Sequence, residues 1–190
     1  MQEPVINHDA IIAATRRWVE RAVIGLELCP FADGVYRRGV VRFRVCEQRS
    51  AAGLILDLRA ELSHLHAADP RDCETTLLIH PWVLNDFVEY NEFLQFCDET
   101  VREAGLEGEI QVASFHPRYQ FAGTDPDDIE NHTNRSPFPT LHLLREASVE
   151  RALSAVADPA SIYENNILKL RALGPEGWRA LWRDESDSSE

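Results

Sequence analysis

The sequence predicts a small α/β protein: a mainly parallel, three-stranded sheet with flanking helices and a C-terminal helical segment. Segments with the apolar pattern of strands alternate along the chain with segments whose apolar residues recur at helical spacing. The order helix, strand, helix, strand, helix, strand is typical of a small sheet with right-handed crossovers. Because 190 residues suffice for one hydrophobic core, we expect a single domain over residues 1–183.

The first part of the chain contains two expected helices and one strand. Apolar residues at helical spacing predict a helix from about Ala10 to Leu28, which Asp9 would cap and Cys29-Pro30 would end. The next segment, Val40–Cys46, alternates apolar residues with arginines, which is typical of an edge strand with one face in water. Ser50 is placed to cap the second helix.

The middle of the chain contains the two clearest strands. Thr75–His80 is the most continuously apolar segment and is expected in the centre of the sheet. A helix from about Asn85 to Ala104 should end at Gly105. The third strand, Glu109–Phe115, leads directly into His116-Pro117.

The last third of the chain begins with a long loop, 117–139, that has no periodicity but carries aromatic anchors. Loops of this length in compact domains are often functional. Three helical segments should follow: Pro139 to Val156, one capped by Asp158, and a short one opened by Pro175. Residues 184–190 are expected to form an acidic disordered tail.

Composition excludes several classes of partner. A formal charge of −13 disfavours nucleic acid and anionic membranes, because either would be approached against repulsion. No signal pattern or membrane-spanning run occurs, so a cytoplasmic location is expected. The four cysteines are scattered, which favours reduced thiols. The oligomeric state is left open by the sequence.

Three reactive side chains, Cys29, His80 and His116, are each followed by proline at the end of an expected element. A residue before proline is pushed towards an extended conformation, so these side chains should lie where the chain changes direction. Ligands of α/β proteins bind at the carboxyl ends of parallel strands. His80 and His116 therefore indicate a site at one edge of the sheet.

Several sequence blocks resemble a bacterial family catalogued as domain of unknown function 1415. The matching blocks are Leu28-Cys29-Pro30-Phe31-Ala32, Thr75-Thr76-Leu77-Leu78-Ile79-His80-Pro81, Ser114-Phe115-His116-Pro117, Tyr119-Gln120-Phe121-Ala122-Gly123, Asn134-Arg135-Ser136-Pro137 and Leu141-His142-Leu143-Leu144-Arg145-Glu146. The resemblance runs from about Trp18 to Trp178. It implies no activity, so the residues themselves must indicate the function.

His80 and His116 are candidates for a general acid and base, or for metal ligands with His142 as the third. His132 or an aspartate of the long loop could replace His142, and the metal would be zinc or another divalent ion. The strand ends would have to be neighbours, roughly 5 Å apart. Alternatively, the histidines are hydrogen-bonded structural groups. Cys29 could act as a nucleophile with either histidine, or be a buried packing residue.

An anion-binding element is expected at Asn134-Arg135-Ser136, which would enter a helix with Ser136 as its cap. Arg135 would orient an anionic substrate, with His142 and Gln120 nearby. Alternatively, Arg135 pairs with a carboxylate of residues 125–130 and only fixes the loop.

The leading hypothesis is a small cytoplasmic enzyme that hydrolyses an anionic small molecule, or transfers a group on it, at a His-centred site. The alternative is a non-catalytic module that binds or senses an anion or a metal. A purely structural role for the loop is a third reading. The tryptophans, including Trp178 and Trp182, are expected in the core and not in a ligand platform.

Overall fold

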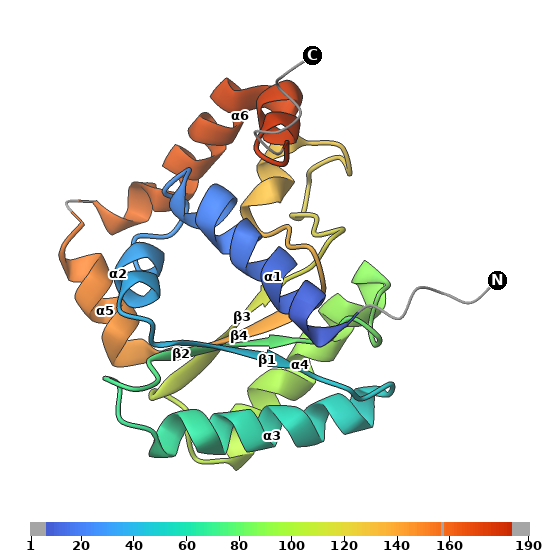
Figure 1. Cartoon of the computed structure of the whole chain (residues 1–190), viewed down its shortest axis with the longest axis vertical. Coiled ribbons are helices and arrows are strands. Elements are labelled where there is room, and N and C mark those ends of the chain that lie inside the picture. Colours follow the sequence, from blue (N-terminus) through green and yellow to red (C-terminus); the bar gives the residue numbers. More distant parts are fainter. Residues whose placement is uncertain (1–6, 157, 184–190) are drawn as a thin grey trace.

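The computed structural model describes residues 7–156 and 158–183. Its centre is a sheet of four strands in the order β1-β2-β4-β3 (Figure 1). The strands are β1 (Val41–Val45), β2 (Thr75–Ile79), β3 (Ile110–Phe115) and β4 (Thr140–Arg145). β1 pairs with β2 in parallel, whereas β4 is antiparallel to both β2 and β3. The protein is therefore α/β, with a mixed sheet.

The prediction of three mainly parallel strands was wrong because β4 was expected to begin a helix at Pro139. The segment is a strand up to Arg145, and only then does α5 (Glu146–Ser154) begin. Leu141 and Leu143 are fully buried in the core beneath the sheet, and Leu144 is buried in a different cluster. A strand covered on both faces has a nearly continuous apolar sequence, which periodicity alone does not distinguish from a buried helix.

Five elements in the middle of the chain agree with the sequence prediction. β1 lies at an edge of the sheet, and all residues of β2 are buried. Helix α3 (Ala51–Ala67) is capped by the hydroxyl of Ser50, which accepts the N–H of Gly53 at 3.1 Å. Helix α4 (Phe87–Glu103) is followed by Gly105 with φ of 71° and then by β3.

The first helix differs from its prediction. Helix α1 (His8–Trp18) is capped by Asn7, whose side chain accepts the N–H of Asp9, so Asp9 is not the cap. The chain continues as a π-helix from Val19 to Ile24, and Cys29 lies in the coil before a short unpredicted helix, α2 (Ala32–Arg37). Cys29 therefore does not close a long helix.

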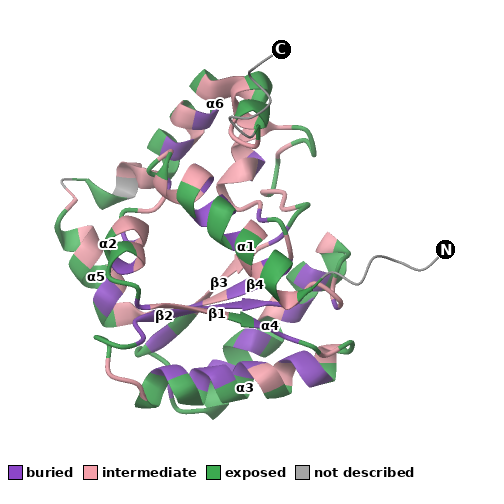
Figure 2. Ribbon diagram, in the orientation of Figure 1, coloured by how far each residue is buried: buried purple, intermediate pink, exposed green. Residues whose placement is uncertain are grey.

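The helices form a layer on each face of the sheet (Figure 1). α3 and α4 cover one face, where the principal core cluster includes Leu58 and Leu62, both fully buried. α1 and the π-helix cover the other face, where Ile11 and Trp18 pack against strand residues such as Ile79. Figure 2 shows buried residues concentrated on the surfaces where helices meet the sheet.

The C-terminal part returns to α1. The long loop contains a 3-10 helix, Ile129–Thr133, against which α6 (Ile162–Ala180) packs. α6 follows the 3-10 turn Pro159–Ser161 and is kinked at Gly174, whose φ is 66°. Beyond the kink, the Leu181 and Arg183 carbonyls accept hydrogen bonds from Arg21 at 2.9 and 3.2 Å. This end of the chain is thereby held against the π-helix.

Within the described residues, no helix is both long and apolar enough to cross a membrane. The expected acidic tail, 184–190, lies outside the described residues.

Candidate functional site

His80 and His116 lie at the same edge of the sheet, as expected, but not on neighbouring strands. They follow β2 and β3, and β4 lies between those strands. The two rings contact the Tyr90 ring of α4, with centroid distances of 5.6 Å from His80 and 5.1 Å from His116. The expected direct pair of strand-end histidines was therefore wrong: β4 separates their strands, and both rings pack on Tyr90.

Both histidines are fully buried and bind the backbone. The Nδ1 atom of His80 lies 3.0 Å from the Val83 carbonyl oxygen. In His116, Nδ1 accepts the Arg118 N–H at 3.0 Å and Nε2 lies 3.3 Å from the Leu84 carbonyl oxygen. The Tyr90 hydroxyl donates to the Thr140 carbonyl at 2.9 Å. These contacts are typical of structural histidines.

Burial keeps both rings neutral at neutral pH. Desolvation lowers the pKa of His80 to about 4 and also lowers the pKa of His116. The Nε2 atom of His80 is buried without a hydrogen-bond partner among the described residues. Protonation of His80 would therefore place a charge in a closed core. A catalytic acid or base, in contrast, must be accessible to the substrate.

Cys29 and His142 line a small apolar pocket of about 50 Å³ on the α1 side of the sheet. The Thr75 hydroxyl donates to the Leu143 carbonyl at 2.6 Å, so it accepts the Nε2–H of His142 at 2.7 Å. Desolvation lowers the pKa of His142 to about 4, and burial raises the pKa of the Cys29 thiol. The structure thus places Cys29 in a pocket with His142, whereas the sequence suggested His80 or His116 as its partner.

The expected metal ligands do not assemble. His80 and His116 pack on Tyr90, whereas His142 binds Thr75. Across the described ranges, no group of three or more His, Cys, Asp or Glu side chains is arranged to hold a metal ion.

The Asn134-Arg135-Ser136 segment does not begin a helix, because the chain runs from the 3-10 helix into β4. The Asn134 amide donates to the Ser114 carbonyl at 3.1 Å, and the Ser136 hydroxyl donates to the Phe138 carbonyl at 2.6 Å. Asn134 therefore holds the loop against β3, whereas Ser136 bonds within the loop. Ser136 acts neither as a helix cap nor as part of an N-terminal anion site.

Arg135 and Gln120 also bind backbone carbonyls of the loop. The Nε–H of Arg135 donates to Tyr119 at 3.0 Å and its Nη2 donates to Pro126. The Gln120 amide donates to Thr124 at 2.6 Å. The alternative expectation was that Arg135 fixes the loop by pairing with a carboxylate. Arg135 does fix the loop, but it binds carbonyl oxygens.

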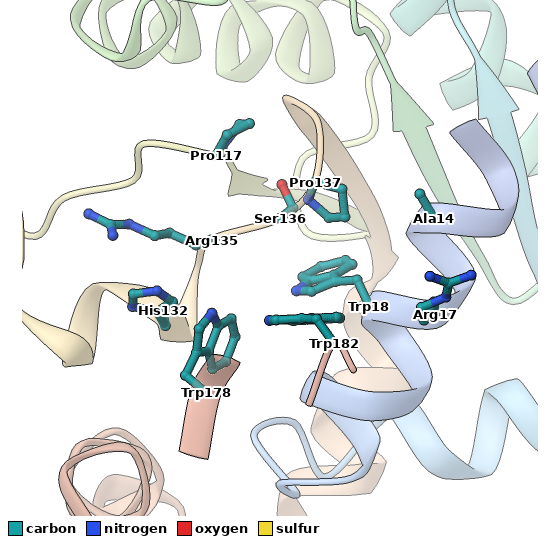
Figure 3. Close-up of a pocket in the computed structure, with 10 residues that line it drawn as sticks. All are labelled: Ala14, Arg17, Trp18, Pro117, His132, Arg135, Ser136, Pro137, Trp178 and Trp182. Atoms are coloured by element: carbon teal, nitrogen blue, oxygen red, sulfur yellow. The ribbon is translucent and has the colours of Figure 1, made fainter. Parts of the chain in front are cut away.

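A pocket of about 400 Å³ lies between α1, the long loop and the end of α6 (Figure 3). We call it the tryptophan pocket. Its lining residues are Ala14, Arg17, Trp18, Pro117, His132, Arg135, Ser136, Pro137, Trp178 and Trp182. Two of the expected substrate-binding residues, Arg135 and Ser136, are among them, whereas His80, His116 and Cys29 are not.

Within the described ranges, the lining of the tryptophan pocket contains arginines but no carboxylate. Arg17 is exposed on α1, and its guanidinium has no hydrogen-bond or ion-pair partner in the part of the chain that the structure describes. His132 directs Nδ1 to the Ile129 carbonyl oxygen at 3.2 Å. Desolvation and the charge of Arg135 lower the pKa of His132 to about 4, so its ring is neutral at neutral pH. The described lining is therefore cationic at neutral pH.

The sequence did not reveal the tryptophans as pocket residues. Trp18 is separated from Trp178 and Trp182 by most of the chain, and all have the helical spacing of core residues. The kink at Gly174 and the hydrogen bonds from Arg21 bring them together. No local signal in the sequence reports this tertiary contact.

The fold and this pocket define an α/β protein with an aromatic, cationic pocket beside its first helix. The chain belongs to the family described as protein of unknown function (DUF1415), whose model matches residues 10–180. This match confirms the family resemblance seen in the sequence. Neither the comparison with curated proteins nor the comparison with solved structures gives a match.

Proposed function

We propose that the protein binds a small organic anion with a planar apolar part in the tryptophan pocket, and that it acts as a binding or sensing module. The observation that supports this proposal most strongly is the charge of the side chains that line the pocket. The whole chain has a net charge of −13, yet among the described residues the formally charged side chains that line this pocket are Arg17 and Arg135. A cationic pocket on an acidic protein favours an anionic ligand.

The walls support a planar ligand. The indoles of Trp18, Trp178 and Trp182 and the rings of Pro117 and Pro137 line the pocket. Its volume of about 400 Å³ is in the range of small-molecule sites, which combine apolar walls with a few polar groups. Arg17 can supply the charge, because no carboxylate of residues 7–156 or 158–183 pairs with its guanidinium.

An enzyme is the second candidate, and His132 favours it. The ring lines the pocket, and with its proton on Nδ1 the Nε2 atom could accept a proton from a bound substrate. A pKa of about 4 makes this ring a weak base near neutral pH, so binding without turnover is the better-supported function. Conversion of a bound anion that is lost in His132→Ala would favour the enzyme instead.

The test compares benzoate with benzamide, which has nearly the same shape but no charge, by saturation-transfer NMR. We expect the protein to bind benzoate more tightly than benzamide and Arg17→Ala to lose about fivefold or more in benzoate affinity, as for loss of one charge interaction. Arg102→Ala is the matched control, because Arg102 is an exposed helix arginine outside the pocket and without an ion pair among the described residues. Equal affinity for the two probes, or equal losses in the two variants, would contradict the proposal.

A further inference from the structure

We propose that the indole N–H groups of Trp18, Trp178 and Trp182 form an oxyanion site, so that the ligand carries a carboxylate or phosphate group. This inference rests on the proposed function and adds the chemical identity of the anionic group. The tryptophans that would recognise this group were expected from the sequence to lie in the core.

The three indoles come from the end of α1, from α6 and from the turn that follows α6. Trp18 is the last residue of α1, and Trp178 and Trp182 follow the kink in α6. The rings of Trp178 and Trp182 are 5.5 Å apart between centroids and inclined by 70°. In Figure 3, the nitrogens of all three rings lie on edges that border the space between Trp178 and Trp182.

None of these indole N–H groups has a hydrogen-bond acceptor among residues 7–156 and 158–183. The lack of an acceptor is most unusual for Trp18, because this residue is only 3% exposed. A buried indole N–H usually finds a partner, and its loss leaves a costly unpaired donor. The Trp18 nitrogen keeps some exposed surface, and Trp18 lines the tryptophan pocket.

An indole nitrogen is only a donor, so the missing partner must be an acceptor. Donors from three directions suit a group with several lone pairs on adjacent oxygens, such as a carboxylate or a phosphate. Negative charge strengthens each of these hydrogen bonds. Arg17 adds a cation at the same pocket, and its lining includes no carboxylate from the part of the chain that the structure describes. These features together favour an oxyanion over a neutral acceptor.

Hydrogen bonds from Arg21 and a ring contact with His132 fix the position of the site. The guanidinium of Arg21 donates to the carbonyls of Leu181 and Arg183, which flank Trp182. Trp178 also packs edge-to-face on His132, at 4.4 Å between centroids. These contacts fix the two C-terminal indoles before a ligand binds, which reduces the ordering that binding requires.

The experiment uses the full chain labelled with ¹⁵N in its tryptophan side chains. The protein has four tryptophans, and the fourth, Trp82, is an internal control. Trp82 packs against His8 and Arg49 and does not line the pocket. Benzoate and inorganic phosphate are the probes, with benzamide as the neutral reference.

We expect the indole N–H signals of Trp18, Trp178 and Trp182 to shift saturably with at least one of the two anions, while Trp82 does not respond. The anion that binds more tightly identifies the carboxylate or the phosphate as the recognised group. Trp182→Phe keeps an aromatic ring but removes one donor, so its affinity should fall about tenfold, whereas Trp82→Phe should bind normally.

Two results would overturn the inference, and they differ in what they say of the proposed function. If benzoate binds in an Arg17-dependent way but the three indole signals do not shift, the indole site is refuted and anion binding stands. If neither anion binds to the wild-type protein, both proposals fail.

Discussion

Acidification should destabilise the protein strongly between about pH 6.5 and pH 4, because His80 is buried in a neutral form. Burial lowers the pKa of His80 from 6.5 to about 4. In the unfolded chain the same ring binds a proton near its usual pKa. Within this window the unfolded state holds more protons than the folded state, so stability is complete above the unfolded pKa and falls as the pH decreases.

The magnitude follows from the size of the pKa difference. A shift from 6.5 to about 4, at about 1.4 kcal/mol per pH unit, gives His80 a contribution of about 3 kcal/mol between pH 7 and pH 4. The value applies to a fully desolvated ring, and His80 has no exposed surface. Below pH 4 both states bind the proton and this contribution levels off.

Urea denaturation at pH 7 and at pH 4 measures the effect in the wild type and in His80→Asn. The asparagine amide can still donate to the Val83 carbonyl but does not titrate. His80→Asn should lose stability at pH 7 through the smaller side chain, and its pH dependence should be flatter by about 3 kcal/mol. His64→Asn, an exposed position on α3, is the control for a histidine substitution at the surface. An unchanged pH dependence in His80→Asn would refute this account of His80.

Three further outcomes follow from individual contacts. Tyr90→Phe leaves the Thr140 carbonyl without its donor, so the free energy of unfolding in urea should fall by about 1–3 kcal/mol. Gly105→Ala should lower the free energy of unfolding by about 1 kcal/mol because φ is 71°. Gly34→Ala, within α2 and in open space, should raise it by about 0.5–1 kcal/mol. A rise for Gly105→Ala or a fall for Gly34→Ala would contradict the backbone argument. Because burial raises the pKa of the Cys29 thiol, iodoacetamide should alkylate Cys29 in the folded protein much more slowly than in urea at pH 7, and equal rates would contradict its burial.

The sequence predicted those elements whose signals are local. Ser50 caps α3 through its own hydroxyl, and Gly105 follows α4 with a positive φ. The alternation in β1 and the continuous apolar run in β2 reflect how far each strand is buried. In these elements the residues that define the structure lie within the element or beside it.

The errors have a common physical cause, because each depends on tertiary contacts. Leu141 and Leu143 could lie in a buried helix or a buried strand, and pairing with β2 and β3 decides between them. Because β4 lies between β2 and β3, the strands that end at His80 and His116 are not neighbours. Arg135 and Ser136, which were expected to bind the substrate, line a pocket, but the expected helix start is wrong because the segment leads into β4.

The measurement that tests the central claim most directly is a crystal structure of the protein with benzoate. We predict benzoate in the tryptophan pocket, with its carboxylate oxygens within hydrogen-bond distance of the indole nitrogens of Trp18, Trp178 and Trp182 and its ring against the aromatic walls. Benzoate bound at another site, or an empty tryptophan pocket in crystals saturated with benzoate, would contradict the account.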